Sequence, residues 1–448
     1  MAARRFIGWW FFGVVALIGF ATLMNAVIDP YGLYRWVSVA GFNRHKTQAV
    51  DQSQLVKPYW VARSQPTTLL VGSSRVEVGF DPESSSWPDA MRPVFNLGIP
   101  GSDPASQLRI LQHALAMTRP KYVIFGVSFA DAHKPPARGL FATKAPVKNA
   151  IHSEFEARLG VTKDGTPNPG LGLAHMKDVA ATLLSLDALD DSLRTALFQR
   201  DPNRSRLTSL GFNTAAGFHG LVRSDGTYNL FVDKDRIKIT EIIQWAMEPR
   251  LEIEPLARAI DLAQQHGTEV AVVIAPVEAD ELEIYRQAGV MTHYDHWRRE
   301  VADIVAGASR SGHAALWDFS AVTRYTAEPL PPPGDRRTEL NWFWESNHFK
   351  PALGDIIISR MFGNGPPDFG RLITPETLSE EQAAQRALLR NYEKTRPDDV
   401  RRVSELYAAG LQQACRTNRE YCRQRRTAAP GDGKDFMTVQ QDVLQENP

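Results

Sequence analysis

The 448-residue chain has no net charge and almost no cysteine. Lys+Arg and Asp+Glu both number 51, so the basic surplus expected of a nucleic-acid-binding protein is missing. The sequence also has no Walker or dinucleotide glycine fingerprint, and no His/Cys/Asp/Glu cluster at metal-ligand spacing. No segment of about 20–50 residues repeats along it. We therefore expect no nucleic-acid partner, no metal and no cofactor.

The two cysteines, Cys415 and Cys422, are separated by seven positions. In one continuous helix seven residues rise about 10.5 Å, which exceeds the roughly 7 Å over which a disulfide joins two alpha carbons. A disulfide bond therefore requires a break in the helix near Thr417, whereas a continuous helix excludes the bond. The sequence leaves both arrangements open.

The amino-terminal segment lacks charge over a long stretch. Residues Phe6–Ile28 are uncharged and long enough to cross about 30 Å of hydrocarbon as a helix. Arg4 and Arg5 precede them, which predicts a cytoplasmic amino terminus and an exported body. A cleaved signal peptide would have a shorter apolar region ending in small residues, and the following Asp29–Tyr31 is a poor cleavage site. A buried core helix does not fit the Trp/Phe-rich run, so we predict an uncleaved single-pass anchor.

Apolar runs typical of buried parallel strands follow the anchor. A helix expected after Asp103, with Pro104 in its first turn, lies between two of these runs. Strand, helix and strand in this order favour a parallel sheet. We predict an α/β fold, a three-layer α/β/α arrangement with a mainly parallel sheet of about five strands. The predicted strands are residues 67–72, a short strand ending near Asn96, and residues 121–127, 268–276 and 314–319.

Composition divides the chain into four regions. Residues 1–28 form the cytoplasmic stub and anchor, and residues 29–66 form a polar juxtamembrane approach. Residues 67–369 form the α/β domain, and residues 370–448 form a charged, helical and partly disordered tail. Residues of about 132–250 lack clear periodicity and contain many Gly and Pro residues. We interpret them as an insertion over the carboxyl edge of the sheet, where it would act as a lid or substrate wall.

The first predicted strand ends abruptly in Gly72-Ser73-Ser74-Arg75. A serine hydroxyl is a poor nucleophile until a histidine takes its proton and an acid orients that histidine. His348 precedes a helix expected at residues 351–362, and Glu345 lies three positions before it. The sequence thus predicts Ser74 as nucleophile, His348 as general base and Glu345 as the orienting acid, with Asp318 as a rival acid.

These residues resemble the SGNH (GDSL-type) esterases and acyltransferases. The first block of that family, a strand followed by Gly-Asp-Ser, matches Gly72–Ser74, and the second block matches Asn96–Gly101. The last block, Asp-x-x-His before the final helix, matches Glu345–His348. The resemblance covers residues of about 67–362. It implies an SGNH-like fold and an oxyanion hole formed by the backbone N–H groups of Ser74 and Gly101.

The sequence departs from the family pattern in its third block. The family has an asparagine there that donates to the oxyanion, whereas this chain has Ser128 and Asp131 nearby. Loss of one such donor typically costs about 2.7–4 kcal/mol in the barrier, which leaves an inactive protein as an alternative. Asp131 and Arg75 are candidates for substrate binding, although a surface ion pair is the plainer role for Arg75.

An anchored, exported SGNH-type domain is also similar in plan to proteins of polysaccharide O-acetylation in bacterial envelopes. This resemblance implies an inner (cytoplasmic) membrane protein with the bulk of its chain in the periplasm. It would act as a serine esterase or O-acyltransferase on acyl groups, acetyl in particular, of an envelope polysaccharide. Its partners would be that polysaccharide or a membrane protein that donates acyl groups. The alternative is an inactive scaffold or glycan-binding subunit of an export or modification complex.

Overall fold

The computed structural model describes residues 2–133, 153–246, 249–310, 313–363 and 365–417. The strands among these residues are β1 Thr68–Gly72, β2 Val94–Asn96, β3 Tyr122–Val127, β4 Glu269–Ile274, β5 Ala314–Asp318, β6 Phe343–Glu345, β7 His348–Phe349 and β8 Arg371–Ile373. The described α-helices are α1 Ala2–Ile28, α2 Ser53–Ser64, α3 Ser74–Gly79, α4 Pro104–Met117, α6 Leu171–Leu184, α7 Leu186–Leu197, α8 Gly217–Asp225, α9 Thr227–Trp245, α10 Glu254–Gln265, α11 Ala279–Ala288, α12 Met291–Ser309, α13 Pro351–Phe362, α14 Pro375–Thr395 and α15 Pro397–Thr417. Two short 3-10 helices are η1 Ala49–Gln52 and η2 Asp89–Met91.

The main sheet has six strands in the order β2-β1-β3-β4-β5-β8, and its first five strands are parallel. These five are the strands predicted from the sequence. The sixth, β8, pairs antiparallel with β5, so the predicted number of about five strands was one too low. Only three residues long and exposed at Arg371 and Leu372, β8 has no strand-like sequence pattern.

The strand order 2-1-3-4-5 is doubly wound, with the chain crossing from one side of β1 to the other after β2. In such sheets ligands bind outside the carboxyl ends of the strands, at the point where the direction of winding reverses. Here that point lies between β1 and β3, where Gly72 pairs with Gly126. The residues directly after β1 therefore occupy the position that favours a functional site.

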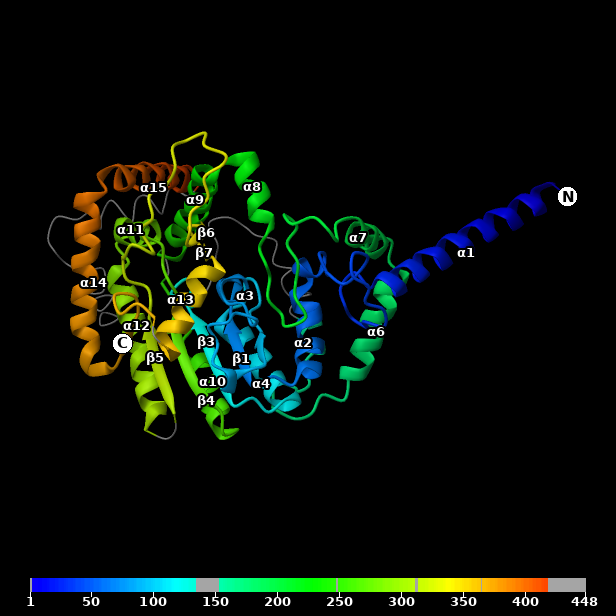
Figure 1. Ribbon diagram of the computed structural model, residues 1–448, viewed down its shortest axis with the longest axis horizontal. Helices are drawn as coiled ribbons and strands as arrows, with labels where there is room; N and C mark the ends of the chain where they lie inside the picture. The colour runs from blue at the N-terminus through cyan, green and yellow to red at the C-terminus, as the bar shows by residue number, and fades with distance from the viewer. Residues whose placement is uncertain (1, 134–152, 247–248, 311–312, 364, 418–448) are drawn as a thin grey trace, which may run out of the picture.

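Helices cover both faces of the sheet (Figure 1). Side chains alternate along each strand, so that Leu69 and Val71 face a core formed with α4 and α10, whereas Leu70 faces a core formed with α13. The alternation follows from the period of two in a strand. The start of α4 is as predicted, because the side chain of Asp103 accepts a hydrogen bond from the Ser106 N–H at 2.8 Å.

The carboxyl-terminal helices α14 and α15 pack on the body at the side opposite to α1 (Figure 1). Arg402 of α15 donates to Asp280 of α11 at 2.5 Å and to Asp235 of α9 at 3.2 Å, and both carboxylates are buried. The helical character predicted for the tail is confirmed over these two helices. Cys415 lies in α15 and Cys422 lies outside the described residues, so the choice between a disulfide bond and a continuous helix stays open.

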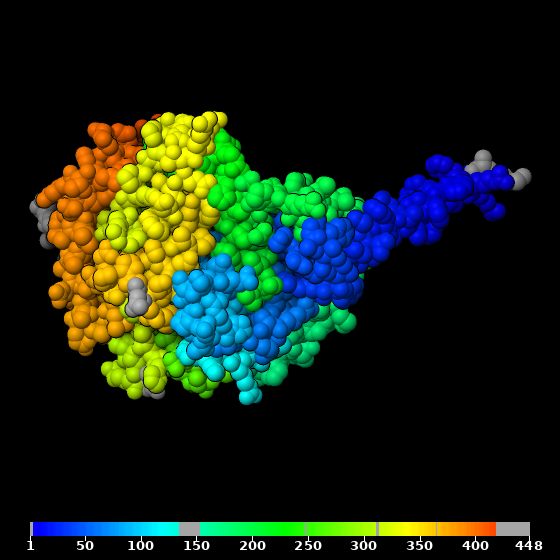
Figure 2. All heavy atoms as spheres, in the orientation of Figure 1, coloured from blue at the N-terminus to red at the C-terminus, as the bar shows by residue number. Residues whose placement is uncertain are grey.

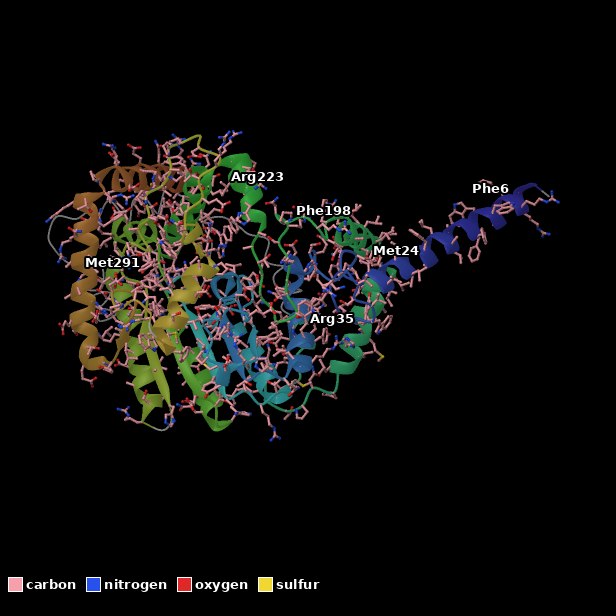
Figure 3. All side chains as sticks on the ribbon, viewed as in Figure 1. Phe6, Met24, Arg35, Phe198, Arg223 and Met291 are labelled. Atoms are coloured by element: carbon pink, nitrogen blue, oxygen red, sulfur yellow. The ribbon has the colours of Figure 1, made fainter. Side chains whose placement is uncertain are left out.

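Helix α1 projects from the body as a single rod, with Phe6 near its outer end and Met24 near its base (Figures 2 and 3). Among the described residues, α1 is the one helix long and apolar enough to cross a membrane. Its outer side chains are exposed, among them Trp9 and Trp10 at 74% and 62%. The predicted apolar anchor segment is therefore a continuous helix.

Candidate active site

The turn after β1 is built for close approach between backbone segments. A Cβ atom on Gly72 would lie 2.4 Å from the Val76 side chain and 2.6 Å from the carbonyl oxygen of Gly126, and one on Gly126 would lie 2.3 Å from Val76. Glycine at both positions thus lets α3 begin directly above the ends of β1 and β3. Ser74 is the first residue of α3, at the carboxyl edge of the sheet.

Ser74, His348 and Glu345 form a continuous hydrogen-bonded chain. The Oγ atom of Ser74 lies 2.8 Å from Nε2 of His348, and Nδ1 of His348 makes a short hydrogen bond to Oε1 of Glu345. Strands β6 and β7 position the histidine and the acid, because Glu345 pairs with His348 across a tight antiparallel hairpin. The predicted geometry of these three residues is therefore confirmed, although they are far apart in the sequence.

Glu345, the acid bound to His348, is buried and ionised. Burial alone would raise the pKa of Glu345, but His348, Lys234 and Lys238 outweigh burial and lower the pKa to about 2. An ionised carboxylate on Nδ1 fixes the tautomer in which Nε2 accepts a proton from the serine hydroxyl. The arrangement can therefore deprotonate Ser74 when the hydroxyl attacks a carbonyl group.

Arg75 does not form the surface ion pair expected from the sequence. Its side chain is 3% exposed, and its guanidinium group donates to Glu281 at 2.9 Å and to Oδ1 of Asn347 at 2.7 Å. Lys238 binds the same carboxylate and donates to the backbone carbonyl of Ser346 at 2.6 Å. Arg75 and Lys238 together hold the two turn residues of the β6–β7 hairpin, so Arg75 has a supporting role and is not free to bind substrate.

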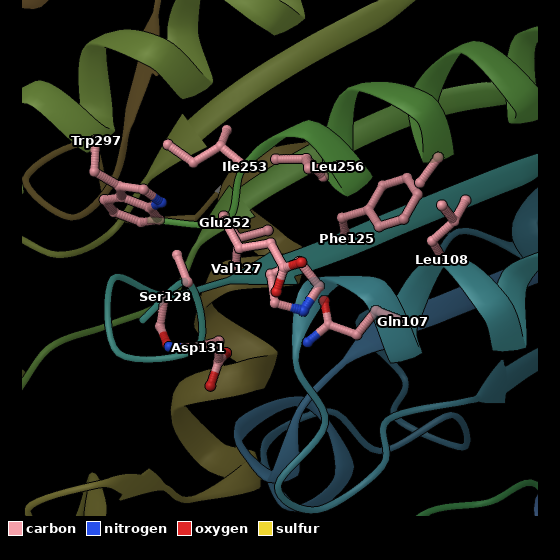
Figure 4. Close-up of a pocket in the computed structure, with 13 residues that line it drawn as sticks. Gln107, Leu108, Phe125, Val127, Ser128, Asp131, Glu252, Ile253, Leu256 and Trp297 are labelled. Carbon is pink, nitrogen blue, oxygen red and sulfur yellow. The ribbon is translucent and has the colours of Figure 1, made fainter. Parts of the chain in front are cut away.

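The neighbouring serine has a different partner. Ser73 Oγ donates to Oδ2 of Asp131 at 2.9 Å, and the Asp131 N–H donates to Ser128 Oγ at 3.2 Å. Burial raises the pKa of Asp131 above its ordinary value, against the opposing effects of Arg75 and the two serines. Asp131, Ser128, Gln107 and other side chains line a small pocket with a volume of about 20 Å³ (Figure 4). This volume is enough for about one water molecule, so the pocket does not admit a substrate.

Gly101 lies in the turn after β2 with φ of +68° and open space where a side chain would be. Among the described residues, none accepts a hydrogen bond from its backbone N–H. A donor in this state could bind an oxyanion, and the neighbouring Pro100 lines the same cleft as Ser74. The orientation of the Gly101 N–H toward Ser74 stays a prediction.

A cleft with a volume of about 690 Å³ opens in front of Ser74 and His348. One wall comes from the insertion, through Glu154, Arg158, Ser205, Asn213 and Phe218. This agrees with the predicted role of the insertion as a substrate wall. The lining combines polar side chains, such as Asp51 and Asn213, with apolar ones, such as Leu55 and Phe218.

The opposite wall was not anticipated from the sequence. It comes from residues 50–55, in η1 and the first turn of α2, and Lys57 lies behind this wall in α2. Lys57 is fully buried, binds Glu77 of α3 at 3.0 Å and donates to the carbonyl oxygen of Gly98. The ion pair connects α2 to α3, and the hydrogen bond connects α2 to the turn that carries Gly101. The one sequence signal was a lysine inside the apolar run Leu55–Val61, which is uncommon unless the charge is paired.

Other candidates from the sequence are placed elsewhere. Asp318 is buried and accepts from Arg298 at 2.9 Å and from Ser320, so it is not the acid that orients His348. In the described part of the chain, no group of three or more His, Cys, Asp or Glu side chains is arranged to hold a metal ion.

The comparisons with known proteins give no family. No protein-family profile, no curated protein and no solved structure matches the chain. The fold and the site thus define an α/β protein with hydrogen-bonded Ser, His and Glu side chains at the carboxyl edge of its sheet.

Proposed function

We propose that this chain is a membrane-anchored serine esterase or O-acyltransferase of the SGNH type. The observation that supports it is the hydrogen-bonded chain from Ser74 through His348 to Glu345, in front of an open cleft. An SGNH-type site would lie at the carboxyl edge of a parallel sheet, as this site does. We propose that it acts on acyl groups, acetyl in particular, of an envelope polysaccharide.

The proposed reaction has two acyl transfers. Ser74 Oγ attacks the ester carbonyl while His348 Nε2 takes its proton, and Glu345 stabilises the resulting imidazolium. The backbone N–H groups of Ser74 and Gly101 would stabilise the oxyanion. Collapse breaks the bond to the leaving alcohol, which receives the proton from His348. A water molecule or a sugar hydroxyl then attacks the acyl-serine by the same route, and this choice separates an esterase from an acyltransferase.

We propose that the anchor places the cleft in the periplasm. The support is the position of Arg4 and Arg5 before the charge-free part of α1, which favours retention of the amino terminus in the cytoplasm. The inner membrane and a membrane-bound acyl donor belong to the same proposal. They follow from the resemblance to envelope O-acetylation proteins and from no contact in the molecule.

The alternative is an inactive scaffold or glycan-binding subunit. The observation that favours it is the third block, where Ser128 and Asp131 bind each other and Ser73 in place of an oxyanion-binding asparagine. With one oxyanion donor fewer, the expected cost of about 2.7–4 kcal/mol would slow the reaction roughly a hundred- to a thousand-fold. Such a rate would still be measurably faster than uncatalysed hydrolysis in water.

The two proposals are separated by hydrolysis of a small acetyl ester by the purified full chain in detergent. Ser74→Ala and His348→Ala should each abolish the activity, and the double variant should be little worse than either one, because the residues act as a unit. Ser73→Ala is the matched control and should have a milder effect. Unchanged activity in Ser74→Ala would refute the catalytic role of this serine, and a wild-type rate equal to that of all variants would favour the scaffold.

A further inference from the structure

The exposed part of α1 is too short to cross a bilayer alone. Arg4 and Arg5 mark its charged end, and the continuously apolar, solvent-exposed or half-exposed part runs from Phe6 to Phe20. At about 1.5 Å per residue this part rises about 22 Å, which is less than the roughly 30 Å of hydrocarbon. Residues after Phe20 must therefore also lie at hydrocarbon depth if α1 crosses the membrane.

Over those next residues α1 is packed against other helices. Ala21 and Asn25 are buried at 2% and 0% exposure, and α1 contacts both α6 and α7 there. Figure 1 shows α6 and α7 flanking the base of α1. Because α1 must continue in the bilayer at this level, the ends of α6 and α7 beside it must reach the bilayer as well.

The turn between α6 and α7 has the hydrogen bonding that such a position requires. The Asn25 side chain donates to the carbonyl oxygens of Thr182 and Ser185 at 3.0 Å each, and it also reaches Leu183. Its Oδ1 accepts from Ser192 Oγ at 2.9 Å. Carbonyl groups at a helix end would cost several kcal/mol each if left unsatisfied in hydrocarbon. One buried asparagine thus satisfies the carbonyl groups of the turn.

The exposed side of this region is rich in large apolar side chains. In α7, Leu186, Leu193 and Leu197 are exposed at 62%, 42% and 77%, and they share one helix face opposite the buried strip of Ala188, Ser192 and Thr195. Arg194 and Asp190 pair along the edge of this face, and Asp190 lies only four residues after Leu186. A helix with an apolar face edged by charged residues is typical of the membrane interface.

The same exposed apolar character continues around the base of α1. Leu184 and Met176 of α6 are 64% and 63% exposed, and Trp36 in the loop after α1 is 67% exposed. Trp36 also lines an apolar groove of about 340 Å³ together with Met176 and Leu183. Tryptophan is favoured at the boundary between headgroups and acyl chains. Contiguous exposed apolar surface of this extent marks an interaction site.

We infer that these side chains form a second membrane-contacting surface, here called the hairpin surface: Trp36, Met176, Leu184, Leu186, Leu193 and Leu197. The lipid bilayer is its partner, because the surface surrounds α1 at the depth where the exposed part of that helix ends. The hairpin surface lies in the outer part of the bilayer, beside the base of α1. The membrane-embedded part of the protein therefore extends beyond the exposed part of α1. The inference depends on α1 crossing a bilayer and is independent of the catalytic proposal.

The test uses the full chain in phosphatidylcholine–phosphatidylglycerol vesicles. Single cysteines are introduced by Leu186→Cys, Leu197→Cys or Trp36→Cys in a Cys415→Ser, Cys422→Ser background and labelled with an environment-sensitive fluorophore. Doxyl-labelled lipids serve as quenchers. We expect emission shifted to shorter wavelength and several-fold stronger quenching at these positions than at Glu380→Cys, the control at an exposed position of α14, on the side of the body opposite to α1.

Two further outcomes would overturn the inference. Water-like emission without quenching at the three positions means that the surface faces solvent. Shifted emission without quenching by doxyl lipid means that protein, such as a second copy of the chain, covers the surface. Phe11→Cys in α1 reports the anchor itself. If the label at Phe11 is also not quenched, the anchor is refuted with the hairpin surface, and the esterase assay on the purified chain is unaffected.

Discussion

Adjacent hydroxyl groups on Ser73 and Ser74 have separate partners. Ser74 Oγ contacts His348, whereas Ser73 Oγ donates to Asp131. The difference arises because Ser73 is the extended residue before α3 and Ser74 is the first helical one, so their side chains leave the backbone in different directions. Only Ser74 has a base and faces the cleft.

Glu345→Gln tests the role of the acid at this scale. The amide is close in size but can donate to Nδ1 of His348, which would leave the proton on Nε2 and block acceptance of the serine proton. We expect kcat for acetyl-ester hydrolysis to fall by about 10²- to 10⁴-fold, with KM nearly unchanged. Glu345→Asp, the residue of the family pattern, is the control and should retain more activity. Equal kcat in Glu345→Gln and the wild type would contradict the triad.

At the scale of elements, a buried charge cluster holds the β6–β7 hairpin in place. Arg75 comes from α3, Lys238 from α9 and Glu281 from α11, so three helices meet beneath Asn347. Burial alone would raise the pKa of Glu281, but Arg75 and Lys238 outweigh burial and hold the pKa at about 2. The position of His348 thus depends on ion pairing among elements that are distant in sequence.

The cluster predicts a pH dependence of stability. The pKa of Glu281 is about 2 in the folded chain against an ordinary value of 4.5, so the unfolded chain binds more protons between these values. The stabilising contribution is complete above about pH 4.5 and is lost as the pH falls toward 2. Chemical denaturation followed from pH 6 to pH 3 should show this loss. Glu281→Gln should be less stable than the wild type at pH 6 and should lose less stability on acidification. An equal dependence of stability on pH in the variant and the wild type would contradict the role assigned to Glu281.

Local patterns sufficed to predict the five parallel strands, whereas the choice of Ser74 over Ser73 rested on the resemblance to the SGNH pattern. Each strand is an apolar run, and Ser74 and His348 both lie beside a predicted element end, so their meeting follows from the sheet edge. The partners of Arg75 could not be predicted, because Glu281 lies in a helix whose packing on α3 has no local sequence signal. Strand β8 and the Lys57–Glu77 pair were missed for the same reason: both depend on contacts that only the folded chain defines.

At the scale of the whole molecule, α1 and the cleft are connected through one segment. The chain leaves α1 at Ile28, and residues 50–55 already line the cleft beside Ser74. Lys57 then joins this segment to Glu77 and Gly98. The segment after α1 therefore forms part of the candidate active site as well as the link between that site and α1.

The topology of the anchor can be tested in cells. Arg4 and Arg5 before the uncharged part of α1 predict a cytoplasmic amino terminus and an exported body. A reporter enzyme that works only after export should therefore be active when it is fused after Pro448. The matched control is a reporter that is active only in the cytoplasm. Strong activity of that second reporter would place the body in the cytoplasm and contradict the periplasmic location and the polysaccharide substrate together.

The central claim is that Ser74 is a nucleophile activated by His348, and a fluorophosphonate probe tests it without knowledge of the substrate. The probe reacts covalently with an activated serine, and mass spectrometry of the digested full chain locates the adduct. We expect one adduct on Ser74, still present in Ser73→Ala and lost in His348→Ala. An adduct on Ser73, labelling that persists in His348→Ala, or no labelling of the folded wild-type chain would contradict the account.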